Sequence, residues 1–188
     1  MANRSTITSI PNLITYARIV LIPVICWLLV TGDLGLRVLA LALYIIAALS
    51  DWLDGYLARK WQLSSRLGQM LDPIADKLLV GALLIVFAWD GSFSDLDLIP
   101  VVAIMLREIF VAGLREFLGK AEVVVKVTQL AKWKTTVQMV ALVAVFVQAL
   151  VPGTSLITDL LLWLAAALTV ITGAQYFLGA WPHLTAEP

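Results

Sequence analysis

Long apolar stretches alternate with short polar connections along the whole chain. A helix needs about 20 apolar residues, at a rise of 1.5 Å per residue, to cross a hydrocarbon core of about 30 Å. Six stretches approach or exceed this length, and we expect each to be a transmembrane helix: residues 12–31, 35–59, 68–89, 98–118, 134–150 and 155–181. The pattern therefore predicts an all-α integral membrane protein with six transmembrane helices and a short N-terminal juxtamembrane segment.

Composition agrees with this pattern. Of the 188 residues, 61% are hydrophobic and 14% are charged, whereas soluble domains are about half apolar and a quarter charged. The connections are short and no repeat is visible, so we expect one membrane domain over residues 1–188 with neighbouring helices packed as antiparallel hairpins. The first apolar stretch ends at Thr31-Gly32-Asp33 without a small-x-small motif, so no cleaved signal peptide is expected.

The formal net charge is zero, but the charges are unevenly placed along the chain. One set of helix ends carries Arg4, Arg18, Arg59, Lys60, Arg66, Arg115, Lys120, Lys126, Lys132 and Lys134. The opposite connections carry Asp33, Asp90, Asp95, Asp97 and Asp159, with Arg37 as the one base. Lys and Arg are enriched in cytoplasmic loops. Both termini and the loop after the second helix are thus expected on the cytoplasmic side of a bacterial inner (plasma) membrane, and no nucleic-acid partner is expected.

Four aspartates near the cytoplasmic ends of the second and third helices are the main candidates for chemistry. Asp51 and Asp54 are three residues apart, and Asp72 and Asp76 are four apart, so each pair shares one helical face. One charge at membrane depth already costs about 2.5–3.5 kcal/mol on insertion scales, so four carboxylates together need protonation or a metal ion. Oxygen ligands without His or Cys suit Mg²⁺, Mn²⁺ or Ca²⁺, and two carboxylate pairs could hold two ions around a phosphoryl group.

The residues around these aspartates favour a ligand site over a network of charges that merely locks two helices. Gly55 and Ala58 follow the first pair by one turn and leave space against the backbone. Arg59 follows at the cytoplasmic end, where a guanidinium can bind a phosphate through two hydrogen bonds. Locking the helices is the competing interpretation, but four acids with one matching base suit it poorly.

The spacing Asp-x2-Asp-Gly-x2-Ala-Arg-x8-Gly-x3-Asp-x3-Asp, from Asp51 to Asp76, resembles the motif of the CDP-alcohol phosphotransferase family. The resemblance implies six transmembrane helices, a homodimer, and transfer of a phosphatidyl or related group from a CDP-linked donor to an alcohol with release of CMP. It implies a site for two Mg²⁺ or Mn²⁺ ions on the four aspartates, with Asp76 also taking the proton of the attacking hydroxyl. It further implies that Gly55 and Ala58 flank the cytidine, that Arg59 holds the diphosphate, and that Ser65 contacts the donor.

Basic residues in the fourth and fifth stretches bear on the acceptor alcohol. Arg107 and Arg115 share one face two turns apart, and Lys132 and Lys134 begin the fifth stretch. Converging bases beside a metal site suggest a second anion, such as a phosphate on the acceptor. Two alternatives stay open: Glu108 and Glu116 could simply pair with the arginines, and the lysines, Lys126 included, could be positive-inside anchors.

Segments 10–18, 107–117 and 132–142 are similar to the branch of the family whose acceptor is sn-glycerol 3-phosphate. This resemblance implies CDP-diacylglycerol as donor, with phosphatidylglycerol phosphate and CMP as products. The acceptor phosphate would meet Arg107, Arg115, Lys132 and Lys134, and the donor headgroup would lie near Asn12, Thr15 and Arg18. Another acceptor, such as inositol phosphate or serine, remains an alternative. A divalent-cation transporter is another, although no inverted repeat of the kind common in transporters is visible.

Overall fold

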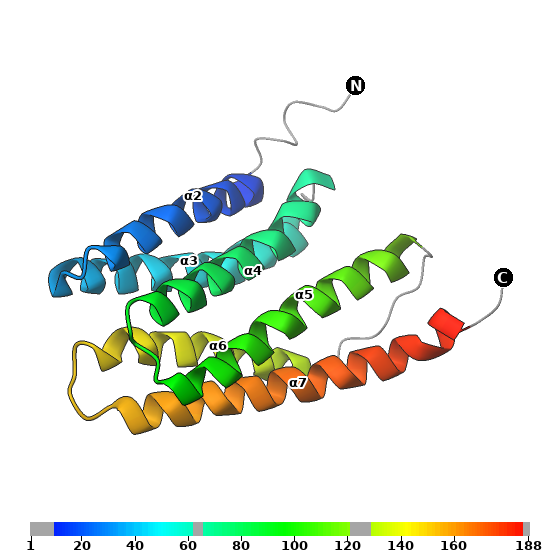
Figure 1. The fold of residues 1–188 in the computed structure, drawn as a ribbon. Coiled ribbons are helices and arrows are strands. Elements are labelled where there is room, and N and C mark those ends of the chain that lie inside the picture. The colour runs from blue at the N-terminus through cyan, green and yellow to red at the C-terminus, as the bar shows by residue number, and fades with distance from the viewer. Residues whose placement is uncertain (1–9, 62–65, 121–128, 186–188) are drawn as a thin grey trace. The chain divides into compact units, whose positions relative to one another are not determined.

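The computed structural model describes residues 10–61, 66–120 and 129–185, and within these ranges it leaves out the side chains of residues 10, 11, 51–61, 66, 69 and 120. This part of the chain is helical and contains no strand (Figure 1). The helices are α2 (Ile10–Val30), α3 (Leu34–Trp61), α4 (Arg66–Trp89), the short 3-10 helix η1 (Asp95–Asp97), α5 (Leu98–Lys120), α6 (Gln129–Gln148) and α7 (Ser155–Thr185). They form two compact units, residues 1–90 and 91–188.

Three described helices are long and apolar enough to cross a membrane: Asn12–Val30 within α2, α6, and α7. A shorter apolar helix, Leu34–Ser50, forms the first part of α3. The chain is therefore a membrane protein, and the prediction of an all-α fold is confirmed for the described residues. The prediction of six spans goes further than these three helices, because α4 and α5 carry charged residues such as Asp72, Asp76, Arg107 and Glu108 within their length.

The predicted helix boundaries agree with the structure to within a few residues, except at the start of α6. That helix begins at Gln129, five residues before the predicted start at Lys134. Hydropathy finds the apolar part of a helix only, whereas Gln129, Leu130 and Ala131 are good helix formers that extend it into polar sequence. The last helix likewise continues through Pro182 to Thr185. The juxtamembrane segment predicted over residues 1–10 lies almost wholly outside the described residues.

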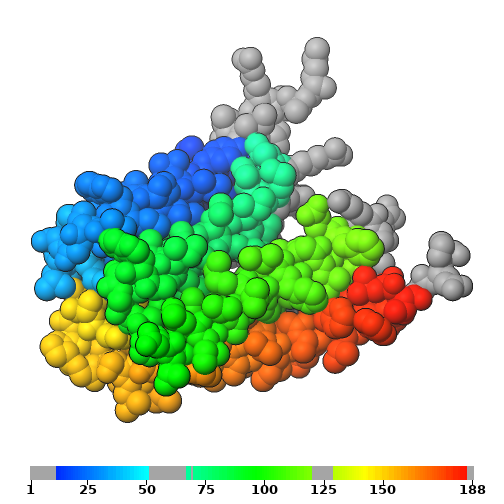
Figure 2. Space-filling model, in the orientation of Figure 1, coloured from blue at the N-terminus to red at the C-terminus, as the bar shows by residue number. Residues whose placement is uncertain are grey.

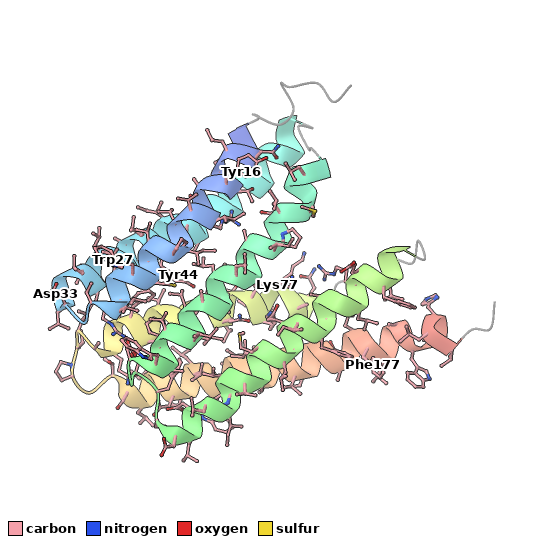
Figure 3. All side chains as sticks on the ribbon, turned by 45° about the horizontal axis from the view of Figure 1, so that its top comes forward. Tyr16, Trp27, Asp33, Tyr44, Lys77 and Phe177 are labelled. Atoms are coloured by element: carbon pink, nitrogen blue, oxygen red, sulfur yellow. The ribbon has the colours of Figure 1, made fainter. Side chains whose placement is uncertain are left out.

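In the first unit, α2 packs against both α3 and α4. The buried apolar residues of α2 follow a helical period on one face: Ile22, Ile25, Leu28 and Leu29. Buried alanines on the neighbouring helices, Ala40 and Ala47 on α3 and Ala75 on α4, let the backbones approach closely, as small residues do in membrane helix pairs. The outward faces stay apolar, and Trp27 is among the exposed residues (Figure 3).

The turn between α2 and α3 is fixed by local hydrogen bonds. Gly32 adopts a φ of 73°, which favours glycine, and its N–H donates to the carbonyl of Leu29 at 3.1 Å. The Asp33 carboxylate accepts from the N–H of Leu36 at 2.8 Å and so caps the start of α3. These contacts reverse the chain between the two helices. Figure 3 labels Asp33 at this turn and Tyr16 toward the other end of α2.

An ion pair joins α3 to the residue that follows α4. Arg37 Nη1 lies 2.9 Å from Asp90 Oδ2, with the two side chains 12% and 11% exposed. The Arg37 guanidinium also lies 5.4 Å from the ring centroid of Phe87, a cation–π distance. The pair holds together the helix ends that lie far from the aspartates.

In the second unit, α7 packs against α5 and α6, and Figure 2 shows the surface of α7 lying along that of α5. The buried apolar residues lie in stripes of helical period, with Val101, Ile104, Val111 and Leu118 on α5 and Ala141, Leu142, Val145 and Phe146 on α6. Leu162, Ala165 and Ala166 complete the apolar core from α7. The stripe on α5 is interrupted by Arg107 and Glu108, which introduces charge into this unit.

Candidate functional site

A guanidinium and two carboxylates form a cluster between α2 and α4 in the first unit. Arg18 Nη1 donates to Asp76 Oδ1 at 2.8 Å and to Asp72 Oδ1 at 3.4 Å. The Arg18 side chain is 1% exposed, whereas those of Asp72 and Asp76 are 44% and 41% exposed. This group, called the Arg18 cluster below, therefore combines a fully buried cation with carboxylates that a ligand can still reach.

The position of Arg18 follows from the polar end of the buried face of α2. Asn12, Thr15 and Arg18 are spaced by three residues, and all three are buried. The helix α2 packs on α4, and Arg18 is the residue of this face that contacts Asp72 and Asp76. The three residues predicted to lie near the donor headgroup thus share one buried face, and one of them contacts two predicted metal ligands.

Pro73 lies inside α4 at this turn. It has no N–H to donate to the carbonyl four residues earlier, so the helix lacks one backbone hydrogen bond here. One turn on, the Lys77 ammonium donates to the Pro73 carbonyl at 3.1 Å. Figure 3 labels Lys77 on this stretch of α4. The helix continues past the proline and keeps Asp72 and Asp76 on the same side, four residues apart.

Asp72 and Asp76 offer the kind of oxygen donor that a divalent cation prefers. One oxygen of Asp72 and one of Asp76 each lie within 3.4 Å of the same nitrogen of Arg18, so the two oxygens already converge on positive charge. Hard oxygen donors of this kind suit Mg²⁺ or Mn²⁺. Among the described side chains, no three His, Cys, Asp or Glu residues gather as a metal site.

The other predicted residues of this region lie outside what the structure describes. Residues 51–61 are helical as the last part of α3, which places Asp51 and Asp54 on one helical face, but their side chains are not described. The same holds for Gly55, Ala58 and Arg59. Ser65 and Lys126 fall outside the described ranges altogether.

A second charged cluster lies inside the second unit and joins its three long helices. Arg107 Nη1 on α5 donates to Glu108 Oε1 at 3.1 Å, and Nη2 donates to Thr172 Oγ1 on α7 at 3.3 Å. The Lys134 ammonium on α6 is hydrogen-bonded to the same Glu108 oxygen. These side chains are largely buried, with Arg107 14%, Glu108 15% and Lys134 7% exposed. In this Glu108 cluster, one carboxylate oxygen of Glu108 is thus contacted by two cationic groups from two different helices.

The four bases predicted to meet an acceptor phosphate are not all brought together. Arg107 and Lys134 converge on Glu108, which is the partner that the sequence left as an alternative for the arginine. Arg115 lies two turns further along α5, exposed, with its guanidinium 5.7 Å from the ring centroid of Tyr176 on α7. Lys132 is exposed, whereas Lys134, two residues on, is buried.

Sequence reasoning missed the contribution of α7 to this cluster. Thr169, Thr172 and Gly173 are buried at positions i, i+3 and i+4 of α7, so they form a polar stripe on one face of an otherwise apolar helix. Gln138, one turn after Lys134 on α6, is also buried. The spacing of the two threonines and the glycine could have indicated a polar helix face. Only the packing of α7 against α5 shows that this face contacts Arg107.

The fold and the two clusters define a class of protein: a helical membrane protein with charged side chains buried between its helices. Such buried charges are typical of enzymes and transporters and not of structural proteins. The family model described as CDP-alcohol phosphatidyltransferase matches residues 8–171. The chain therefore belongs to the CDP-alcohol phosphatidyltransferase family and is a transferase.

Individual proteins similar to this chain give a more specific comparison than the family model. A protein of Rickettsia bellii named CDP-diacylglycerol–glycerol-3-phosphate 3-phosphatidyltransferase is 44% identical over 177 residues, covering 90% of this chain and 93% of that protein. Proteins with the same name from Cereibacter sphaeroides and Bacillus subtilis are each 39% identical. The matches cover 95% and 94% of this chain and 98% and 97% of those proteins. The chain thus corresponds to these relatives over nearly their whole length.

Proposed function

We propose that this protein transfers the phosphatidyl group of CDP-diacylglycerol to sn-glycerol 3-phosphate, giving phosphatidylglycerol phosphate and CMP. The observation that carries the proposal is the identity of 39–44% with relatives named for this activity. The two charged clusters support it, because one offers carboxylates to a diphosphate-bound cation and the other offers buried positive charge to an anion. The proposal places the protein in anionic phospholipid biosynthesis.

The donor side of the proposed site centres on the Arg18 cluster. Asp51, Asp54, Asp72 and Asp76 would hold two Mg²⁺ or Mn²⁺ ions, which when bound would neutralise charge on the diphosphate of the donor. Asn12, Thr15, Arg18, Gly55, Ala58, Arg59 and Ser65 would surround the headgroup of CDP-diacylglycerol. Arg18 orients Asp76 through its 2.8 Å hydrogen bond, so the carboxylate has a fixed direction when substrate arrives.

The acceptor side centres on the Glu108 cluster. The phosphate of glycerol 3-phosphate would bind Arg107 and Lys134, and Arg115 and Lys132 would attract it from their exposed positions. Arg107 can do this while keeping its protein contacts, since a guanidinium has five N–H groups. Two of its nitrogens make the described contacts with Glu108 and Thr172.

In the proposed reaction, Asp76 takes the proton from the free primary hydroxyl of glycerol 3-phosphate as general base. The hydroxyl oxygen attacks the phosphorus that carries diacylglycerol. A new P–O bond forms to the glycerol oxygen, and the bond between this phosphorus and the oxygen bridging to CMP breaks. CMP leaves with the bridging oxygen, and the proton passes from Asp76 to solvent.

We further propose a homodimer with six transmembrane helices in the bacterial inner (plasma) membrane, with both termini and the active site on the cytoplasmic side. The gathering of Lys and Arg at one set of helix ends supports the orientation. The resemblance to the family supports the dimer. The lipid bilayer would then supply the donor, whose acyl chains remain in it.

The test is CMP release by the purified protein from CDP-diacylglycerol with a panel of acceptors: sn-glycerol 3-phosphate, inositol phosphate, serine and glycerol. We expect release with glycerol 3-phosphate, loss of release in EDTA, and recovery with Mg²⁺ or Mn²⁺. Asp76→Asn should abolish turnover and still bind CDP-diacylglycerol. Release with serine or inositol phosphate in preference would contradict the acceptor, and full activity of Asp76→Asn would contradict the general base.

A further inference from the structure

The Arg107 side chain lies directly on the backbone of α7 at Gly173. A Cβ atom added to Gly173 would lie 2.8 Å from Arg107 Cγ, 3.4 Å from Nε and 3.7 Å from Cδ. The first of these distances is shorter than real Cβ contacts allow, so any other residue at this position requires Arg107 or one of the two helices to move. The stem of the arginine therefore occupies the space that a side chain at Gly173 would take.

Thr172 holds the other end of the same arginine. Its Oγ1 donates to the carbonyl of Leu168 at 2.7 Å, which directs the oxygen lone pairs away from the α7 backbone. Arg107 Nη2 then donates to this oxygen at 3.3 Å. Two consecutive residues of α7, both buried, thus fix the stem and the guanidinium of one buried cation.

The location of the close contact makes the guanidinium sensitive to it. Cγ is the second side-chain carbon, and the guanidinium lies beyond it through Cδ and Nε. A rotation that relieves a clash at Cγ moves the guanidinium by a larger amount than Cγ itself. A clash with the flexible end of the side chain would have been relieved by a small local adjustment, but one with its stem is not.

We propose that Gly173 and Thr172 are positioning residues that fix Arg107 for the acceptor phosphate and so set the preference for a phosphorylated acceptor. The proposal rests on the proposed function, because it assumes that Arg107 binds the phosphate of glycerol 3-phosphate. Both residues lie just beyond residues 8–171, the stretch that the family model matches. The role of Gly173 and Thr172 is therefore inferred from helix packing in this chain and not from the family match.

The experiment compares Gly173→Ala with Gly113→Ala, a matched control on α5. Both glycines are helical, but an added Cβ at Gly113 meets nothing within 4 Å, and alanine is favoured over glycine in either helix. For Gly173→Ala we expect the KM for glycerol 3-phosphate to rise about tenfold, equivalent to about 1.4 kcal/mol, while the KM for CDP-diacylglycerol stays unchanged. Gly113→Ala should leave both values unchanged.

Two variants of Thr172 separate positioning from packing. Thr172→Val keeps the shape and removes the hydroxyl, so it should also raise the KM for glycerol 3-phosphate. Thr172→Ser restores the hydroxyl and should return the KM toward the original value. Both variants should keep the thermal unfolding midpoint in detergent close to that of the parent protein. If Gly173→Ala fails to fold, the KM values of the two Thr172 variants still test the proposal.

Glycerol, which has no phosphate, provides the readout that packing alone would not change. The ratio of kcat/KM for glycerol 3-phosphate to that for glycerol should fall in Gly173→Ala and Thr172→Val, because only the first acceptor has the group that Arg107 binds. Equal losses for both acceptors, or an unchanged KM for glycerol 3-phosphate in both variants, would overturn the proposal. Failure of the proposed function is distinct, because the parent protein would then not use glycerol 3-phosphate at all.

Discussion

At the scale of single residues, the charged side chains of the two clusters lie next to opposite charges. Arg18 lies against Asp72 and Asp76, and Glu108 is shared by Arg107 and Lys134. An unpaired charge would cost several kcal/mol in such surroundings, so these contacts make the charges tolerable. Asp72 and Asp76 nevertheless stay 44% and 41% exposed, so a charged substrate can reach the Arg18 cluster.

Substitution of Arg18 tests whether its contacts with Asp72 and Asp76 support turnover. A hydrogen bond to a charged group contributes about 1.5–3 kcal/mol. Because Arg18→Met removes the hydrogen bonds to Asp72 and Asp76, it should lower kcat by about 100-fold or more. Arg18→Lys keeps one point charge with less reach and should retain more activity than Arg18→Met. The measurement is CMP release at saturating substrates.

The control for this series is Arg37→Met, which removes an arginine from the same unit but away from the aspartates. It should retain the turnover of the parent protein. Turnover of Arg18→Met equal to that of Arg37→Met would show that Arg18 does not support Asp76.

At the scale of helices, the first unit is held by apolar contacts of α2 and by polar links at helix ends. Arg37 near the start of α3 pairs with Asp90 after α4 and lies over the ring of Phe87. Both partners are largely buried, so the pair is screened less than a surface ion pair. We expect it to fix how the far ends of α3 and α4 lie against each other.

A double-mutant cycle of Arg37→Met and Asp90→Asn measures this contribution. Contacting charged pairs show coupling energies of about 0.5–3 kcal/mol, and we expect about 1–2 kcal/mol here. Unfolding in mixed detergent micelles provides the free energies. Additive effects of the two substitutions would mean that the ion pair does not stabilise the unit.

At the scale of the whole chain, the charges divide between two sets of helix ends. Lys and Arg gather at one set, whereas the connections at the other set carry aspartates with Arg37 as the one base. Asp33 lies in the exposed turn between α2 and α3 (Figure 3), and Gln129 is the exposed first residue of α6. The positive-inside rule predicts that these two positions face opposite sides of the membrane.

Single cysteines at these positions test the orientation. In a Cys26→Ser background, Asp33→Cys should react with a membrane-impermeant maleimide in intact spheroplasts. Gln129→Cys should react only after the membrane is permeabilised. The reverse pattern of labelling would invert the proposed topology.

Much of the fold follows from local sequence. The six α-helices of the described residues fall where the apolar stretches predicted them, because a chain in lipid must satisfy its backbone hydrogen bonds internally. The start of α6 could not be read in this way, since helix propensity and not hydropathy determines it. The candidate site was predictable in part: the spacing of Asp72 and Asp76 places them on one face of α4 in any helical structure.

The sequence by itself determined that the chain is a helical membrane protein and which residue types lie on each helix face, because both depend on periods of a few residues. Only the tertiary structure decided which faces meet. Arg18 lies against Asp72 and Asp76 although they are 54 and 58 residues away, and Glu108 contacts Lys134 from a different helix. Gly173 receives the stem of Arg107 in the same way. Such contacts depend on the rotation and spacing of packed helices, which no local pattern specifies.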